Sequence, residues 1–462
     1  LRRDDFRLFR PDGGEFLTLD ENYAPRLGAE MNLWDDYSGK VYAFYGQYYL
    51  PVASNTAYRS VGAEFFFRER FDFNGLNTVG GVTIPDLGDQ VTGAQDSRYG
   101  NPCPFILSPN GAGGNTCRVT GDGSIPPSDA FFGENLKATK QSEFIVGYEH
   151  DFGEFRAGIS YTHRNLDRTA EDAAIDAAVL AYCDEQGITG CEDVWTGFHQ
   201  YVTYNIGGPL TVTLDGDDSA TSQAIDGQVV TFTPGQLAYP SATRGYDALE
   251  ITFDRPWDGT WQLGGSYTLS EAFGNSEGYV QSDFGQADAG ITQDFDSPGF
   301  TDFATGLLPN HRAHRIRLFG AASPIEGLIL GGNLSVESPR PLSCFGYHPT
   351  DVTANRYGAA SRFCDLQPVP RGAGLETDWE STLDLSARYN LELGVGPEVS
   401  FTVDVFNVFN SQAITQRNEI GDQEVIGFND DGSPSAVLAD PNYGVVTGYQ
   451  ACRLYTSPSP RD

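Results

Sequence analysis

The segments Thr382-Leu-Asp-Leu-Ser-Ala-Arg-Tyr-Asn-Leu391 and Val399-Ser-Phe-Thr-Val-Asp-Val405 decide the fold class of this chain. In both, apolar residues occupy every second position and polar residues occupy the positions between them. Period-two alternation is typical of a β-strand with one apolar and one polar face. Two such runs separated by a short stretch that contains Gly and Pro predict a hairpin.

The same alternation recurs in ten segments along the chain. They are residues 26–33, 40–50, 141–151, 154–165, 244–255, 260–270, 312–322, 326–338, 382–391 and 399–405. Short turns, at 35–39, 151–154, 255–259, 323–326 and 392–398, alternate with long loops, at 51–140, 166–243, 272–311, 339–377 and 411–442. We therefore expect an all-β, antiparallel sheet with every turn at one end and every loop at the other.

This one-sided distribution of loops favours a transmembrane β barrel over a soluble protein. Outer-membrane barrels have short periplasmic turns and long extracellular loops, and their outer face is apolar with aromatic residues at both interfaces. A sheet in lipid must also close, since its edges have no water to satisfy them. The aromatic residues that we expect at the interfaces are Tyr42, Tyr45, Tyr48, Tyr49, Phe152, Trp261, Tyr267, Trp379 and Tyr389. A soluble sandwich or propeller is the alternative.

The charge of the chain excludes one class of partner. Its 63 acidic residues outnumber 29 cationic ones, and the formal net charge is -34, so no nucleic-acid-binding face is expected. Loop 166–243 holds twelve acids against Arg168 alone, and loop 272–311 holds six acids and no base. We interpret these acids mainly as solvated, with cation binding or repulsion of wrong ligands as the alternative. Residues 215–218 and 429–432 are reminiscent of calcium loops, but neither completes an EF-hand, and we expect no metal or cofactor.

Cysteine usage indicates an oxidising compartment. Six of the seven cysteines form three local pairs in Gly-, Pro- or Asp-rich stretches, and we predict a structural disulfide in each pair. The pairs are Cys103 with Cys117, Cys183 with Cys191, and Cys344 with Cys364. The alternative is three pairs of reduced thiols. No C-x-x-C or Cys/His spacing suggests zinc.

The sequence holds no enzyme motif, and we predict no catalytic residue. Neither G-x-S-x-G, a P-loop nor H-E-x-x-H occurs. His311 and His314 are three positions apart, so in a strand they face opposite sides. Glu30 with Arg26, and Asp384 with Arg388, are interpreted as ordinary electrostatics of a wet lumen.

Several stretches, in this order, resemble a known family. The strongest is Val403-Asp-Val-Phe-Asn-Val-Phe-Asn410, followed by Tyr443-Gly-Val-Val-Thr-Gly-Tyr-Gln450. Others are Ala24-Pro-Arg-Leu-Gly28, Tyr45-Gly-Gln-Tyr-Tyr49, Glu143-Phe-Ile-Val-Gly-Tyr-Glu149, Ile159-Ser-Tyr-Thr-His-Arg164, Ser266-Tyr-Thr-Leu-Ser270, Gly274-Asn-Ser-Glu277 and Leu308-Pro-Asn-His-Arg-Ala-His314. The chain resembles the C-terminal part of the barrel of TonB-dependent outer-membrane receptors, in the Oar-like subgroup.

The resemblance implies the second half of a 22-stranded barrel in the cell outer membrane. It assigns residues 1–450 to the barrel and leaves 451–462 as a suspect, non-native tail. It also implies that the plug and the first eleven strands lie outside this fragment. The implied function is uptake of a scarce extracellular ligand, with energy from the TonB complex acting through the plug. A passive channel and a surface adhesin are the alternatives, and the sequence does not identify the ligand or the residues that bind it.

Overall fold

The computed structural model describes most of the chain, including every strand that was predicted. The described residues are 1–10, 13–36, 38–61, 65–68, 71–80, 82–90, 118–122, 128–216, 225–286, 288–391 and 399–450. The suspect tail 451–462, Cys103 and Cys117 lie outside them. No helix among the described residues is long and apolar enough to cross a membrane.

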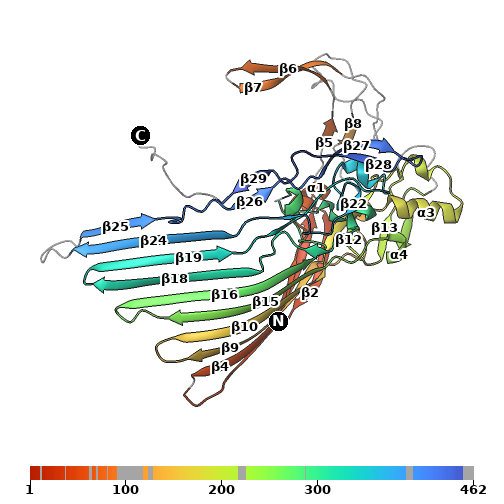
Figure 1. Cartoon of the computed structure of the whole chain (residues 1–462). Coiled ribbons are helices and arrows are strands. Elements are labelled where there is room, and N and C mark those ends of the chain that lie inside the picture. Colours follow the sequence, from red (N-terminus) through yellow and green to blue (C-terminus); the bar gives the residue numbers. More distant parts are fainter. Residues whose placement is uncertain are drawn as a thin grey trace.

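One antiparallel sheet contains all ten predicted strands, neighbours in sequence being neighbours in space (Figure 1). In chain order they are β3 (Arg26–Asn32), β4 (Gly39–Leu50), β9 (Thr139–Asp151), β10 (Arg156–Arg168), β15 (Arg244–Arg255), β16 (Trp261–Gly274), β18 (His314–Ile325), β19 (Leu328–Glu337), β24 (Glu380–Leu391) and β25 (Val399–Val405). A two-residue strand, β17 (Gly306–Leu307), pairs with the loop end of β16. The prediction of ten paired segments is confirmed.

Strand register sorts the side chains into two faces. Ile251 on β15 is paired with Ile159 on β10 and with Tyr267 on β16, whereas its neighbour Thr252 is paired with Gly158 and Ser266. Paired residues share a face, so the apolar alternation of each strand aligns across the whole sheet. We call the apolar side the outer face; it includes Leu27, Met31, Val41, Val146, Ile159, Leu249, Ile251, Leu269, Leu318, Leu334, Leu385, Phe401 and Val403.

The opposite, inner face is polar and charged. It includes Arg26, Glu30, Glu143, Arg164, Glu250, Thr252, Ser266, Thr268, Arg317, Ser335, Thr382, Asp384, Arg388 and Thr402. Two aromatic residues predicted at the membrane interfaces lie on this face instead. Tyr42 is paired with Gly147, and Tyr48 is paired with Gln141. Both residues were expected at a membrane interface because they lie near the end of a strand. Their even-numbered positions, however, point to the polar face of β4, whereas its odd-numbered positions point to the apolar face.

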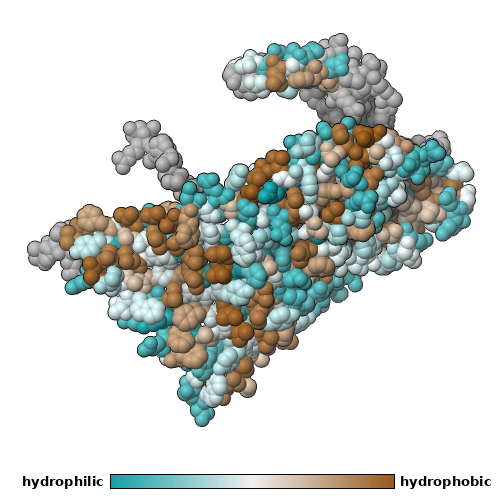
Figure 2. Space-filling view, viewed as in Figure 1, coloured by the Kyte–Doolittle hydropathy of each residue, from teal (hydrophilic) through white to brown (hydrophobic). Residues whose placement is uncertain are grey.

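Apolar side chains of the outer face are exposed, as a lipid-facing surface requires. Leu27, Phe401 and Val403 are 67%, 60% and 63% exposed. Figure 2 shows hydrophobic side chains lying open along the strands of the sheet. Patches of this extent on a soluble monomer are unusual and mark a surface that is covered by something else.

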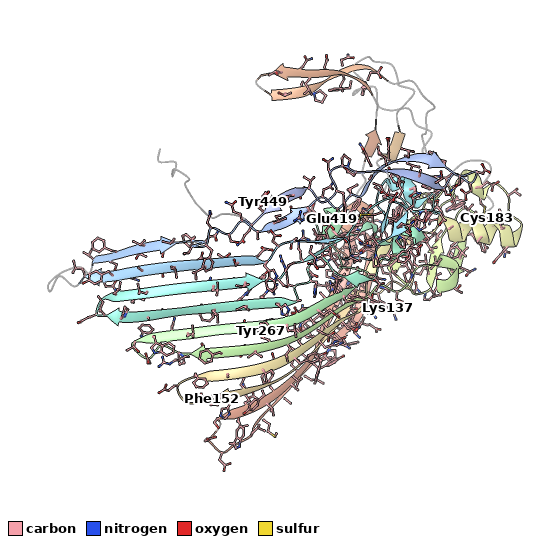
Figure 3. All side chains as sticks on the ribbon, in the orientation of Figure 1. Lys137, Phe152, Cys183, Tyr267, Glu419 and Tyr449 are labelled. Carbon is pink, nitrogen blue, oxygen red and sulfur yellow. A yellow bond between two sulfur atoms is a disulfide. The ribbon has the colours of Figure 1, made fainter. Side chains whose placement is uncertain are left out.

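Aromatic rings border the outer face at its turn end. Phe152 and Phe155 stack with centroids 4.6 Å apart in the turn between β9 and β10, and Phe155 approaches Phe253 at 5.4 Å. Gly153 makes this turn with φ of 90°, a conformation that side-chain-bearing residues rarely adopt. Figure 3 places Phe152 at the turn end and Cys183 and Glu419 at the opposite, loop end.

The sheet is open in this structure. Among the described strands, β3 pairs with β4 alone and β25 pairs with β24 alone. Each therefore has one edge whose backbone groups face no neighbouring strand, and closure would need strands that pair with both edges.

The long loops are themselves folded, and together they form what we call the cap: the described residues of 51–138, 169–243, 275–313, 338–379 and 406–450. Figure 1 shows most of the cap gathered at one end of the sheet, opposite the short turns, whereas the strands at 71–79 and 82–90 stand apart from it. Its elements are α1 (Ser54–Val61), β5 (Phe65–Arg68), β6 (Phe71–Val79), β7 (Val82–Gln90), β8 (Arg118–Asp122), α2 (Ser128–Phe131), β11 (Ala170–Ala174), α3 (Asp176–Gln186), η1 (Cys191–Asp193), β12 (Tyr201–Asn205), β13 (Leu210–Thr213), β14 (Val229–Phe232), α4 (Pro234–Leu237), η2 (Ser282–Phe284), η3 (Gln293–Phe295), η4 (Pro298–Thr301), β20 (Pro341–Leu342), η5 (Ala354–Tyr357), β21 (Phe363–Cys364), β22 (Gln367–Pro368), β23 (Leu375–Glu376), β26 (Ile414–Arg417), β27 (Asp422–Phe428), β28 (Pro434–Ala439) and β29 (Val446–Tyr449). A hairpin of β1 (Arg2–Phe9) and β2 (Glu15–Ala24) packs against the cap through Phe16 and Phe132.

Candidate functional site

The candidate site lies in the cap, because the cap has a buried hydrophobic core of its own. The side chains of Trp195, Val202, Leu210 and Phe232 are completely buried there, in a cluster that also contains Phe295 from the next loop. Loop residues that pack this way can hold functional groups in fixed positions, as a binding site needs.

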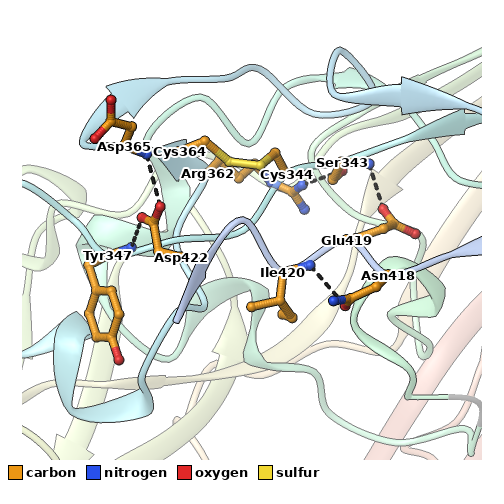
Figure 4. Close-up of a disulfide and its surroundings, with 10 residues drawn as sticks. All are labelled: Ser343, Cys344, Tyr347, Arg362, Cys364, Asp365, Asn418, Glu419, Ile420 and Asp422. Carbon is orange, nitrogen blue, oxygen red and sulfur yellow. Dashed lines mark hydrogen bonds between the residues drawn. A yellow bond between two sulfur atoms is a disulfide. The ribbon is translucent and has the colours of Figure 1, made fainter. Parts of the chain in front are cut away.

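Two disulfides fix the cap covalently. Cys183 is bonded to Cys191 and Cys344 to Cys364, with Cα–Cα distances of 6.6 and 6.2 Å. Figure 4 shows the second bond beside Glu419 and Asp422. Gly421 packs against it so closely that a Cβ atom there would lie 2.5 Å from both sulfurs. The pairing of Cys103 with Cys117 falls outside the described residues.

A buried ion-pair network joins two loops beneath the cap surface. Arg371 Nη2 lies 2.5 Å from Asp294 Oδ1, and Arg362 Nη2 lies 3.0 Å from Asp283 Oδ2. All four side chains are at most 3% exposed. Burial alone would raise the pKa of Asp283, but attraction to Arg362 and Arg371 outweighs burial and leaves that pKa lowered.

Glu419 extends this network to a third loop. Its Oε2 atom accepts a hydrogen bond of 2.5 Å from the backbone N–H of Ser343, the residue before the second disulfide (Figure 4). Burial raises the pKa of Glu419 to about 8, because the charged form is poorly solvated there. The group therefore changes its charge close to neutral pH.

A chain of hydroxyl groups links three loops at the cap surface. The hydroxyls of Tyr201 and Tyr357 lie 2.6 Å apart, and the Tyr357 hydroxyl donates to Asp296 Oδ2 over 2.7 Å. Burial raises the pKa of Asp296 to about 7. Thr292 N–H donates to the buried carboxylate of Glu171, which again joins two of these loops.

A cavity of about 430 Å³ opens beside these tyrosines. Its lining includes Asp176, Glu192, Asp296 and Asp351, with Arg356 as a cation and Trp195 as an aromatic wall. The volume is within the range of small-molecule sites. The geometry suits a ligand that presents positive charge to these carboxylates.

The polar groups of this cavity have different tasks. Asp176 accepts backbone N–H bonds from Gly197, His199 and Gln200, so it holds the loop together. The indole N–H of Trp195, by contrast, is buried and has no hydrogen-bond partner among the described residues. A buried donor without an acceptor is costly, and a ligand oxygen would satisfy it.

The other residues singled out from the sequence do not converge on a site. His311 accepts a hydrogen bond from the Ala272 N–H, while His314 stacks between Tyr267 and Trp379. Within 429–432, Asp431 accepts hydrogen bonds from Ser433 in the turn between β27 and β28. In the part of the chain that the structure describes, no three His, Cys, Asp or Glu side chains are placed to hold a metal ion.

Among the charged side chains that were expected to face one another in the lumen, Glu30 with Arg26 and Asp384 with Arg388, both arginines and Asp384 have other partners. Arg26 lies over the ring of Tyr48, Arg388 donates to Asn390 and Ser400, and Asp384 accepts from the backbone N–H of Asn407. The buried arginines of the cap were not predicted. Their signal in the sequence is only an arginine within a polar loop, and their acidic partners lie about 80 residues away.

Comparison with known proteins finds similarity to one curated transporter. No family model matches the chain. The TonB-dependent transporter Oar of Myxococcus xanthus is 25% identical over 421 residues, which cover 90% of this chain and 34% of that protein. The chain thus spans about a third of the length of the curated relative that it matches.

Solved structures with a similar arrangement are outer-membrane receptors and transporters. The ferripyoverdine receptor of Pseudomonas aeruginosa has 12% sequence identity and a TM-score of 0.37, over 90% of this chain and 32% of that one. The transporter YddB of Escherichia coli has 12% identity and a TM-score of 0.42, over 91% of this chain and 40% of that one.

Proposed function

We propose that this chain is the barrel portion of a TonB-dependent outer-membrane transporter similar to Oar of Myxococcus xanthus, and that the transporter takes up a scarce extracellular ligand. In this proposal the cap captures the ligand, the sheet forms part of a closed barrel, and the TonB complex supplies the energy through a plug. In this proposal the chain carries out no catalysis, in keeping with the name of that transporter.

One observation carries the proposal. All ten strands present an exposed apolar outer face and a polar inner face, with short turns at one end and a folded cap at the other. An apolar exterior, a polar interior and loops on one side are what a membrane barrel requires. The cap cavity then supplies a place for a ligand on the outer side.

Closure of the barrel is part of the proposal. The free edges of β3 and β25 cannot face lipid, because unsatisfied backbone groups cost several kcal/mol each in hydrocarbon. We propose that further strands complete the wall to 22, with the plug inside it. Residues 1–450 would then be the later part of one barrel.

The test compares cells with and without the gene, each in the presence and absence of a functional TonB system. Compounds that disappear from the culture medium are followed by mass spectrometry. The proposal expects at least one compound to be consumed only when both the gene and TonB are intact. Consumption that needs the gene but not TonB would indicate a passive channel, and loss of cell attachment without any change in consumption would indicate an adhesin.

A further inference from the structure

A second cavity, on the inner face just below the cap, is surrounded by arginine side chains. It has a volume of about 480 Å³ and lies where β10, β15, β16 and β18 approach their loops. Four guanidinium groups line it, those of Arg164, Arg244, Arg312 and Arg315. Gln141, Tyr246, Ser270 and Asn310 are among its other lining residues, and no carboxylate is, in the part of the chain that the structure describes.

Each of the four arginines is held by neighbouring groups, most of which lie outside the cavity. Arg244 Nη2 donates to Gln141 Oε1 over 2.8 Å, and its Nη1 donates to the carbonyl of Glu277. Arg312 Nη1 donates to the carbonyl of Ser338 over 2.6 Å, and its Nη2 pairs with Glu380. These two side chains are therefore held by both ends of the guanidinium fork.

The other two arginines are held by one edge only. Arg164 Nε pairs with Glu143, and Arg315 Nε lies 2.9 Å from Glu337 Oε1. Neither Nη1 nor Nη2 of Arg164 or Arg315 has a close hydrogen-bond partner among the described residues. The outer edges of both forks remain available, with geometry that matches the two oxygens of a carboxylate or phosphate.

The side chains that line this cavity include cations and no carboxylate among the described residues, in contrast to the acidic chain as a whole. The four guanidiniums form ion pairs with three carboxylates, Glu143, Glu337 and Glu380, and the carboxylate of Glu277 acts on Arg244 from a greater distance. The chain as a whole carries a formal charge of -34. Like charges around one cavity repel each other, and an anion between them would offset that repulsion.

We propose that this cavity is a subsite for an anionic group, a carboxylate or a phosphate, of the transported ligand. The inference rests on the proposed uptake function and deepens it, since it names a chemical feature that the ligand must carry.

The test measures how fast phenylglyoxal modifies individual arginines of the complete protein in isolated outer membranes. Modified peptides are quantified by mass spectrometry with added inorganic phosphate, added citrate, or chloride at equal ionic strength. An anion that occupies the cavity slows the reaction by a factor of one plus its concentration divided by its Kd. We expect phosphate or citrate to slow modification of Arg164 and Arg315 by about threefold at twice the Kd.

Arg388 is the internal control, because it is exposed on the same face but outside the cavity. The proposal expects its rate to be the same in all three salts. Protection by phosphate but not citrate would assign the subsite to phosphate, and the reverse would assign it to a carboxylate. No protection by either anion, or equal protection of Arg388, would overturn the proposal. Because the test requires no transport, it can fail while uptake is TonB-dependent, or succeed while uptake is not.

Discussion

The sheet and the cap of this molecule are stabilised in opposite ways. In the sheet, large apolar side chains such as Phe401 and Val403 are more than half exposed, so the described part of the protein does not cover them. In the cap, Trp195 and Phe232 are fully buried, and two disulfides and four buried charges add to that core. The sheet depends on lipid for burial, whereas the cap resembles a small exported domain.

Because the two regions are stabilised differently, we expect a substitution in the sheet to leave the stability of the cap unchanged, and a substitution in the cap to leave that of the sheet unchanged. Water and redox conditions act on the cap, while hydrocarbon acts on the outer face. The predictions below test that separation, beginning with the largest effect.

Arg371→Leu should lower the free energy of unfolding of the cap by about 3 to 5 kcal/mol, because it leaves the carboxylate of Asp294 buried without its main partner. Limited proteolysis of intact outer membranes should then cleave the cap loops much faster. The double variant with Asp294→Leu should recover part of the loss, because the uncompensated charge is gone. Unchanged protection in the single variant would contradict a cap stabilised by this network.

Ile251→Arg should affect the sheet and spare the cap. Ile251 is on the outer face, and a cation near the bilayer midplane costs about 2 to 4 kcal/mol. The amount of folded protein in the outer membrane, measured by its heat-modifiable mobility in gels, should fall. Thr252→Arg is the matched control, one residue away on the inner face. Equal losses in the two variants would show that the two faces are not distinguished by lipid.

Removal of the bond between Cys344 and Cys364 by a double Ser substitution should cost the cap about 3 kcal/mol, from the entropy of closing a loop with a separation of 20 residues. Folded protein in the membrane should be unchanged, since the sheet contains no cysteine among its described strands. Loss of the sheet together with the cap would mean that the two regions fold as one unit.

The sheet could be predicted from the sequence because its rules are local. The alternation of apolar and polar residues involves only neighbours in the sequence. It therefore predicted the ten strands, the turns between them and one apolar face of the sheet. Tyr42 and Tyr48 were misassigned because position along the segment was considered without parity. Apart from the disulfides Cys183–Cys191 and Cys344–Cys364, the contacts of the cap could not be predicted, since pairs such as Tyr201 with Tyr357 join residues 156 positions apart. No local pattern specifies which polar loop residues will meet.

The smallest effect should come from pH, and it should be confined to the cap. The native pKa of Glu419 is about 8, above the value of about 4.5 expected when unfolded. The native state therefore binds more protons between these values, so the stabilisation is complete below pH 4.5 and is lost as the pH rises through 8. Relaxation and water entry would limit the loss to about 1 to 2 kcal/mol.

Glu419→Gln should remove this dependence of cap stability on pH and protect the cap from protease at pH 8.5. Glu424→Gln, at an exposed position of β27, should leave the pH dependence, here called the slope, unchanged. Cap proteolysis at pH 5 and pH 8.5 in intact membranes measures the effect, and the folded fraction of the sheet in the same samples should not vary. A slope that survives in Glu419→Gln would assign the pH response to another group of the cap, with Asp296 as the next candidate because its pKa is raised to about 7. A pH dependence shared by the sheet would instead contradict the separation of the two regions, because Glu419 accepts its hydrogen bonds from Ser343 and Phe345 of the cap.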